Sequence, residues 1–74
     1  MLESRTKKAK IVFKIKLKEL RENAGLSQSG LAKELGIVQG TVGNWESGIR
    51  EPNFKMVKKI ARYFNITVDE LIED

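Results

Sequence analysis

The chain has 74 residues, no cysteine, no histidine and a formal net charge of +4 at pH 7. It is therefore one small domain with no disulfide framework or thiolate metal site, and it lacks the commonest general base and zinc ligand. No apolar stretch approaches the ~18 residues of a membrane span and no secretion signal is present, so we expect a cytoplasmic protein with no membrane partner. We also expect no metal, no cofactor and no enzymatic activity.

Positive charge is concentrated at the start of the chain. Residues 1–10 carry Arg5, Lys7, Lys8 and Lys10 with little apolar content, and we interpret them as a flexible basic arm that precedes a folded domain of residues 11–74. Up to residue 24, eight basic residues face three acidic ones, whereas the rest of the chain has a net charge of −1. Such a distribution suits a polyanion such as DNA, and a solvated surface is the alternative interpretation.

Residues 11–24 fit two patterns. Apolar and lysine residues alternate from Ile11 to Lys18, as in a strand, but Phe13, Leu17, Leu20 and Ala24 also form a helical stripe. The stripe continues to Gly25, which suits a left-handed C-terminal cap. We predict a helix over this segment, in which the first residues can adopt an extended backbone conformation instead.

Two short helices joined by a tight turn follow. Ser27 is a good N-cap for a helix over 28–35, which Gly36 ends. A second helix is predicted over 39–47 and ends at Gly48. We expect Val38, Val42 and Trp45 to face the core from this helix.

The remaining sequence predicts two more helices. Asn53 caps a helix over 54–64, whose apolar face begins at Phe54. Thr67 and Glu70 form a capping box for a fifth helix, in which Val68, Leu71 and Ile72 close the core. The predicted fold is all-α, with five short helices.

The stretch LRENAGLSQSGLAKELGIVQGTVGNWESGIREPN, followed by KIARYFNITVDELI, resembles the lambda-repressor-like (Cro/XRE-type) helix-turn-helix domains. The resemblance covers about residues 13–72. It implies a compact five-helix lambda-repressor-like bundle and a transcriptional repressor that binds a pseudo-palindromic operator in double-stranded DNA as a homodimer. The helix over 39–47 would enter the major groove. The dimer contact would use the C-terminal helix, through Val68, Leu71 and Ile72, or the exposed side of Tyr63.

The same resemblance implies the site residues. The matching base-reading positions are Gln39, Gly40, Thr41, Gly43 and Asn44. The matching phosphate-contacting positions are Gln28, Ser47, Arg50, Asn53 and Lys55. Arg21 and Glu46 match a structural ion pair between helices. Plain solvent exposure is the alternative for Gln28, Arg50 and Lys55, and a bond back to its own helix is the alternative for Thr41.

The sequence departs from the family pattern at the start of the reading helix. Val38 stands where members usually carry a hydroxyl residue, and Gly40 and Gly43 stand where larger polar residues are common. We therefore expect fewer direct base contacts and more dependence on phosphates and DNA shape. The arm can wrap DNA or enter the minor groove, or serve only for solubility.

Two rival functions remain open. One is an antitoxin or anti-repressor partner, whose main task is to bind another protein. The other is a non-specific nucleic-acid chaperone that depends on the basic arm. The second predicts indifference to Gln39→Ala, whereas a sequence reader loses its base preference at one position.

Overall fold

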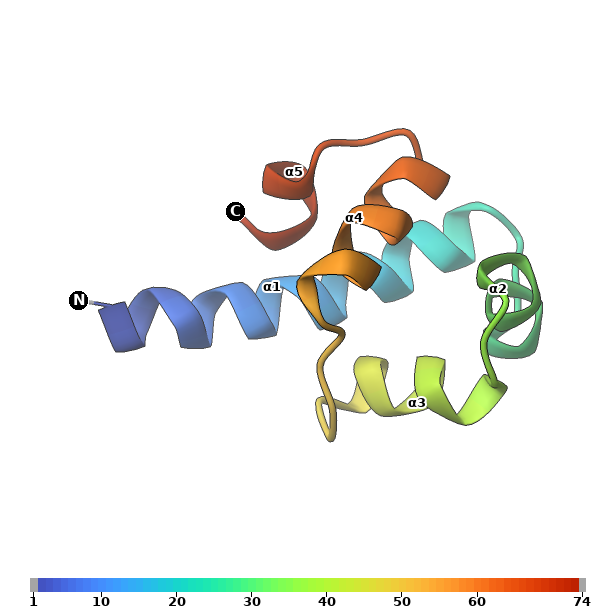
Figure 1. Cartoon of the computed structure of the whole chain (residues 1–74), viewed down its shortest axis with the longest axis horizontal. Helices are drawn as coiled ribbons and strands as arrows, with labels where there is room; N and C mark the ends of the chain where they lie inside the picture. The colour runs from blue at the N-terminus through green and yellow to red at the C-terminus, as the bar shows by residue number, and fades with distance from the viewer. Residues whose placement is uncertain (1, 74) are drawn as a thin grey trace.

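The computed structural model describes the backbone of residues 2–73 and the side chains of residues 11–73. Within this range the chain forms five α-helices and no strand: α1 Leu2–Asn23, α2 Gln28–Leu35, α3 Gln39–Ser47, α4 Phe54–Tyr63 and α5 Val68–Ile72. Helix α1 crosses the molecule, with α3 along one side of it and α5 on the opposite side (Figure 1). The predicted all-α class and five-helix architecture are confirmed. No helix in the described range is both long enough and apolar enough to span a membrane.

Helix α1 begins earlier than predicted. Its backbone is helical from Leu2, so it includes most of the segment that the sequence analysis assigned to a flexible arm, and residue 11 is no boundary in secondary structure. Residues 2–10 contain neither glycine nor proline, and lysine, arginine, alanine and glutamate all favour a helix even where little apolar surface is available. The mobility of this segment stays a prediction.

The predicted caps define the starts of α2, α4 and α5. Ser27 Oγ accepts a hydrogen bond from the Gly30 N–H at 2.9 Å, and Asn53 Oδ1 accepts one from the Met56 N–H at 2.8 Å. Thr67 and Glu70 form the complete capping box before α5. These bonds satisfy N–H groups that have no partner within their own helix, and thereby fix where each helix begins.

The turns around α3 depend on two glycines. Gly36 ends α2 with φ of 72°, and Gly48 ends α3 with φ of 81°. Both values lie in the left-handed region, which side chains with a Cβ atom rarely adopt. The short α2–α3 connection that presents α3 to solvent therefore follows from Gly36.

The core lies between α1 and the other four helices. Six of its side chains are fully buried: Leu17, Leu31, Leu35, Val42, Ile60 and Leu71. Burial of each such side chain stabilises the fold by roughly 1.5–3 kcal/mol relative to exposure. Trp45, which the sequence predicted as a core residue, is 4% exposed and meets Phe13 edge to face with ring centroids 6.4 Å apart. This contact joins α3 to α1.

Lys59 on α4 fixes the end of α2. Its Nζ donates a hydrogen bond of 2.7 Å to the backbone oxygen of Leu35. A cation at a helix C-terminus satisfies a carbonyl that has no partner within the helix and interacts favourably with the helix dipole. The sequence analysis did not predict this role for Lys59.

Two predicted core residues are exposed. Val38, expected to face inward with Val42 and Trp45, is 72% exposed, because its backbone is extended and does not continue the helical stripe. Ile37 packs against the core in its place. Phe54, expected at the start of the apolar face of α4, is 66% exposed and lies under Lys58 Nζ, which is 5.1 Å from the ring centroid.

Burial also corrects one part of the expected dimer contact. Leu71 is fully buried within the bundle, so its side chain is not available to a second copy. Val68 and Ile72 are half-buried, and Tyr63 remains 39% exposed. An apolar contact on this side of the bundle would therefore use Val68 and Ile72 of α5 and Tyr63 of α4.

Candidate nucleic-acid interface

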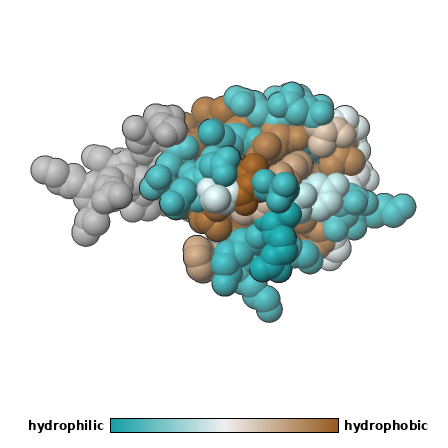
Figure 2. Space-filling view, turned by 90° about the horizontal axis from the view of Figure 1, so that it is seen from above, coloured by the Kyte–Doolittle hydropathy of each residue, from teal (hydrophilic) through white to brown (hydrophobic). Residues whose placement is uncertain are grey.

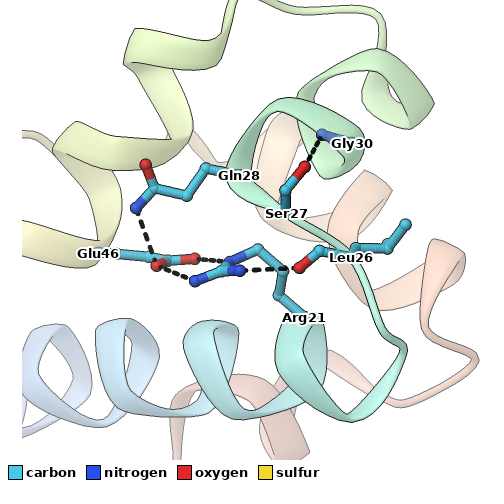
Figure 3. Close-up of polar contacts among 6 residues, drawn as sticks. All are labelled: Arg21, Leu26, Ser27, Gln28, Gly30 and Glu46. Atoms are coloured by element: carbon cyan, nitrogen blue, oxygen red, sulfur yellow. Dashed lines mark hydrogen bonds and ion pairs between the residues drawn. The ribbon is translucent and has the colours of Figure 1, made fainter.

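An ion pair holds α3 against α1. Arg21 Nε donates to Glu46 Oε2 at 2.7 Å, and Arg21 Nη2 donates to Glu46 Oε1 at 2.9 Å. Arg21 Nη1 donates to the backbone oxygen of Leu26 at 2.8 Å, so the guanidinium also fixes the turn before α2 (Figure 3). The two side chains are only 10% and 6% exposed. These residues form the interhelical pair that the family resemblance implied.

Gln28, at the start of α2, joins this cluster. Its Nε2 donates to Glu46 Oε1 at 3.2 Å, as Figure 3 shows. We call Arg21, Gln28 and Glu46 the polar latch, because they come from α1, α2 and α3. All buried side-chain nitrogen and oxygen atoms in the described part of the chain have a hydrogen-bond partner. The latch therefore fixes the orientation of α3 without leaving an unsatisfied polar group.

The latch changes the acid–base properties of its two charged members. The hydrogen bond to Glu46 raises the pKa of Arg21, against the opposing effect of burial. Burial raises the pKa of Glu46, but the hydrogen bonds from Arg21 and Gln28 and the charge of Arg21 outweigh it, so the pKa of Glu46 lies below its usual value. Glu46 therefore stays ionised at neutral pH.

Gly43 lies beside the latch rather than at the open tip of α3. A Cβ atom at this position would be 3.3 Å from Gln28 Oε1. The absence of a side chain thus gives the amide of Gln28 room to pack on α3. The predicted base-reading role of Gly43 and the predicted phosphate contact of Gln28 both stay predictions, and these two residues contact each other here.

At the N-terminal end of α3, by contrast, the side chains are more exposed and that of Gln39 makes no hydrogen bond within the described part of the chain. Gln39 and Gly40 are exposed, and Thr41 and Asn44 are half-buried. The side chain of Gln39 makes no hydrogen bond with any residue in the described range, and a Cβ atom at Gly40 would meet nothing within 4 Å. We call residues 38–41 the α3 tip. Its side chains are available to a partner.

The predicted phosphate contacts lie beyond the C-terminal end of α3 and around the start of α4. Arg50 and Lys55 are exposed cations. Ser47 Oγ donates to the backbone oxygen of Asn44 at 3.2 Å, and Asn53 Oδ1 caps α4. The Ser47 hydroxyl oxygen can still accept a hydrogen bond, but it has no second proton to donate to a phosphate.

A shallow depression connects the base-reading and phosphate positions. It has a volume of about 430 Å³ and is lined on one side by Thr41 and Asn44 of α3 and on the other by Arg50 and Asn53 of the following loop. Lys55 and Ser47 are not part of its lining, and Gln28 lies at the latch. The structure thus brings four of the ten predicted contact residues around one concave surface, next to the α3 tip.

Val38 is a residue of the α3 tip whose exposure the sequence analysis did not predict. It was assigned to the core because it precedes Val42 by four residues, a helical spacing. Its place before the first helical residue was the signal that could have corrected this, because an N-cap residue has extended backbone and does not share the helical stripe.

Comparison with known proteins identifies the motif. Residues 17–71 match the model of the helix-turn-helix family. The chain is 38% identical over 60 residues to the HTH-type transcriptional activator BcrR of Enterococcus faecalis, covering 81% of this chain and 29% of that protein. It is 29% identical over 63 residues to the cryptic phage CTXphi transcriptional repressor RstR of Vibrio cholerae, covering 85% of this chain and 57% of that protein. The chain therefore spans less than two thirds of either relative.

A solved structure has the same arrangement of helices. The solution structure of the SOS-response transcriptional repressor LexA from Eubacterium rectale matches 90% of this chain and 71% of its own, with a TM-score of 0.83 and 34% sequence identity. The relatives are named as regulators of transcription rather than as enzymes. Since the family model covers most of the chain and the fold agrees, the chain belongs to the helix-turn-helix family, as its resemblance to the lambda-repressor-like type predicted.

Proposed function

We propose that this protein is a sequence-specific transcriptional repressor that binds a pseudo-palindromic operator as a homodimer, with α3 in the major groove. The observation that carries the proposal is the α3 tip, where Gln39 is exposed and has no hydrogen-bond partner in the described part of the chain. An amide with free donor and acceptor atoms matches adenine, which presents an acceptor at N7 and a donor at N6 in the major groove.

The residues around Gln39 support a close approach to DNA. Gly40 places no side chain between the helix and a base edge, and open space surrounds it. Thr41 and Asn44 line the depression beside the tip, where they can contact a thymine methyl group, a base edge or a sugar. Direct readout by so few side chains leaves a large share of the affinity to phosphate contacts.

The positive charge next to α3 suits the DNA backbone. Arg50 borders the same depression and Lys55 is exposed in the first turn of α4. The N-terminus of α4 adds the partial positive charge of its helix dipole. These groups fix the position of the protein on the duplex but carry no sequence information by themselves. Affinity should therefore fall steeply as salt is raised.

Dimerisation through the α5 side is consistent with the surface there. Seen from the side of α4 and α5, the molecule exposes hydrophobic areas between hydrophilic ones (Figure 2). Val68, Ile72 and Tyr63 keep part of their surface exposed. This side lies across the bundle from α3 (Figure 1), so a two-fold contact there leaves both reading helices free. Two half-sites would then be about 34 Å apart, one turn of DNA.

Selection from a random double-stranded DNA library at near-physiological salt tests the proposal. An enriched inverted repeat is the expected result, since two copies related by a two-fold axis read two symmetric half-sites. Retained DNA without a common motif would instead indicate a non-specific chaperone. Failure to retain any DNA would indicate that the main partner is a protein, such as a toxin or an anti-repressor.

The homodimer has a separate test. Sedimentation equilibrium of the full chain should show a dimer on the selected operator. A single copy bound to each two-half-site operator, together with a monomer in free solution, would contradict the dimeric part of the proposal while leaving DNA reading intact.

A further inference from the structure

The N-cap of α3 differs from the N-caps of α2, α4 and α5. Ser27, Asn53 and Thr67 each accept a hydrogen bond from the backbone of the helix that they cap. Val38 occupies the same position before α3 and makes no side-chain capping bond. Helix α3 thus forgoes the stabilisation that a serine or threonine would give at this position.

The side chain of Val38 lies mostly outside the core. It is 72% exposed, although its neighbour Ile37 packs against the core. A large apolar side chain that neither caps a helix nor fills a core conflicts with local stability, and such conflicts are expected at functional surfaces. A partner that buries this side chain would resolve the conflict.

The position of Val38 limits which partner surface it can meet. It directly precedes Gln39, and the next residue, Gly40, has open space where a side chain would be. Val38 and Gln39 are therefore neighbouring side chains at the α3 tip, one apolar and one an amide. Whatever Gln39 contacts, Val38 lies beside it.

On the basis of the proposed function, we propose that Val38 is a specificity-determining residue that contacts the 5-methyl group of a thymine next to the base pair read by Gln39. Among the four bases, thymine presents a methyl group in the major groove. Valine offers two methyl groups on a stiff side chain, so it can cover that methyl group without a large loss of conformational freedom. Contact would remove both apolar surfaces from water.

Replacement of single thymines by deoxyuridine in the selected operator tests this contact, because uracil lacks only the 5-methyl group. The dissociation constants are measured by fluorescence anisotropy for each substituted position. We expect one position per half-site at which the loss of the methyl group weakens binding about fourfold, as for the removal of one buried methyl-sized group. At that position, 5-methylcytosine paired with guanine should bind more tightly than cytosine paired with guanine.

The Val38→Ser variant assigns the effect to this residue. It should bind the thymine and deoxyuridine operators equally, while its thermal unfolding midpoint stays equal to that of the native chain or rises, because serine can cap α3. Val38→Ile should keep the preference for thymine. Ile15→Ser is the matched control: Ile15 is 49% exposed on α1, outside the tip, and its variant should keep the full preference for thymine.

Three results would overturn the inference. In the first, the Val38→Ser variant binds the thymine operator over the deoxyuridine operator as strongly as the native chain does. In the second, binding to the operator depends on Gln39, but replacing any thymine by deoxyuridine leaves the dissociation constant unchanged. Both leave the proposed function standing. The third is a library selection that yields no motif, which overturns the proposed function and this inference together.

Discussion

The two ends of α3 differ in how far their side chains are bonded within the chain. At the C-terminal end, Glu46 accepts two hydrogen bonds from Arg21 and one from Gln28, so its carboxylate is satisfied within the chain. At the N-terminal end, Gln39 is exposed without a partner in the described range, and Val38 is exposed and makes no capping hydrogen bond. The latch therefore holds the C-terminal end of α3, whereas the N-terminal end leaves its side chains exposed.

Removal of the carboxylate from the latch should give the largest effect. Glu46→Ala leaves Arg21 buried without its counter-charge, and loss of one partner of a buried pair typically costs about 3–5 kcal/mol. A domain of this size has a total stability of only about 4–11 kcal/mol at the usual per-residue values. Denaturant unfolding followed by circular dichroism measures the loss.

Glu19 provides the control for that experiment. It lies on α1 and is exposed, so Glu19→Ala should change the free energy of unfolding by no more than about 0.5 kcal/mol. If Glu46→Ala were as mild as Glu19→Ala, the latch would not be what holds α3, and the contrast between the two ends of the helix would fail.

The latch should also make stability depend on pH. Because the pKa of Glu46 is lower in the folded chain, its contribution is complete above the unfolded value of about 4.3 and is lost as pH falls through the lower folded value. Glu46→Gln lacks this titration. The difference in unfolding free energy between the native chain and Glu46→Gln should therefore narrow from pH 6 towards about pH 2, and a constant difference over this range would contradict the assignment.

At the tip, a substitution should affect DNA binding and spare stability. Gln39→Ala removes an exposed amide, so its unfolding free energy should stay within about 0.5 kcal/mol of the native value. Its affinity for the selected operator should fall by about 1–3 kcal/mol, with relaxed preference at one base pair. Competition binding against operators altered at each position measures both. A uniform loss across all sequences would assign Gln39 to the phosphate backbone instead.

Alanine substitution at the two glycines of α3 should have smaller effects, which differ between the two positions. Gly40→Ala meets no atoms within 4 Å and should stabilise the fold by up to about 1 kcal/mol through helix propensity, while it weakens operator binding by obstructing close approach. Gly43→Ala places its Cβ 3.3 Å from Gln28 Oε1, so displacement of Gln28 should offset part of the same gain. The thermal unfolding midpoint of Gly40→Ala should be higher than that of Gly43→Ala. The reverse order would contradict the placement of Gln28 on α3.

Much of the fold follows from local sequence signals. Ser27, Asn53 and the Thr67–Glu70 box mark helix starts, and Gly36 and Gly48 mark the turns, because caps and left-handed turns are decided by a few neighbouring residues. The spacing of Leu31, Leu35 and Val42 likewise predicts residues that the structure buries. The resemblance to the family added the pairing of Arg21 with Glu46, which are 25 residues apart in the chain.

The remaining features depend on tertiary geometry. Spacing alone could not show that Val38 lies outside the stripe of α3, or that Leu71 is too deeply buried to meet a second copy. The contact between Gln28 and Gly43 joins two helices at an angle that no local pattern encodes. The helical backbone of residues 2–10 was missed because low apolar content was weighed above helix propensity.

We propose that the α3 tip contacts operator DNA while the latch stays closed. Nuclear magnetic resonance of the isotopically labelled chain, titrated with the selected operator, tests it most directly. We predict the largest amide shifts over residues 38–44, 50–51 and 53–55, with the Nε signal of Arg21 unchanged because its bond to Glu46 persists. Unchanged amides over 38–41, with the main shifts elsewhere in the bundle, would contradict the claim.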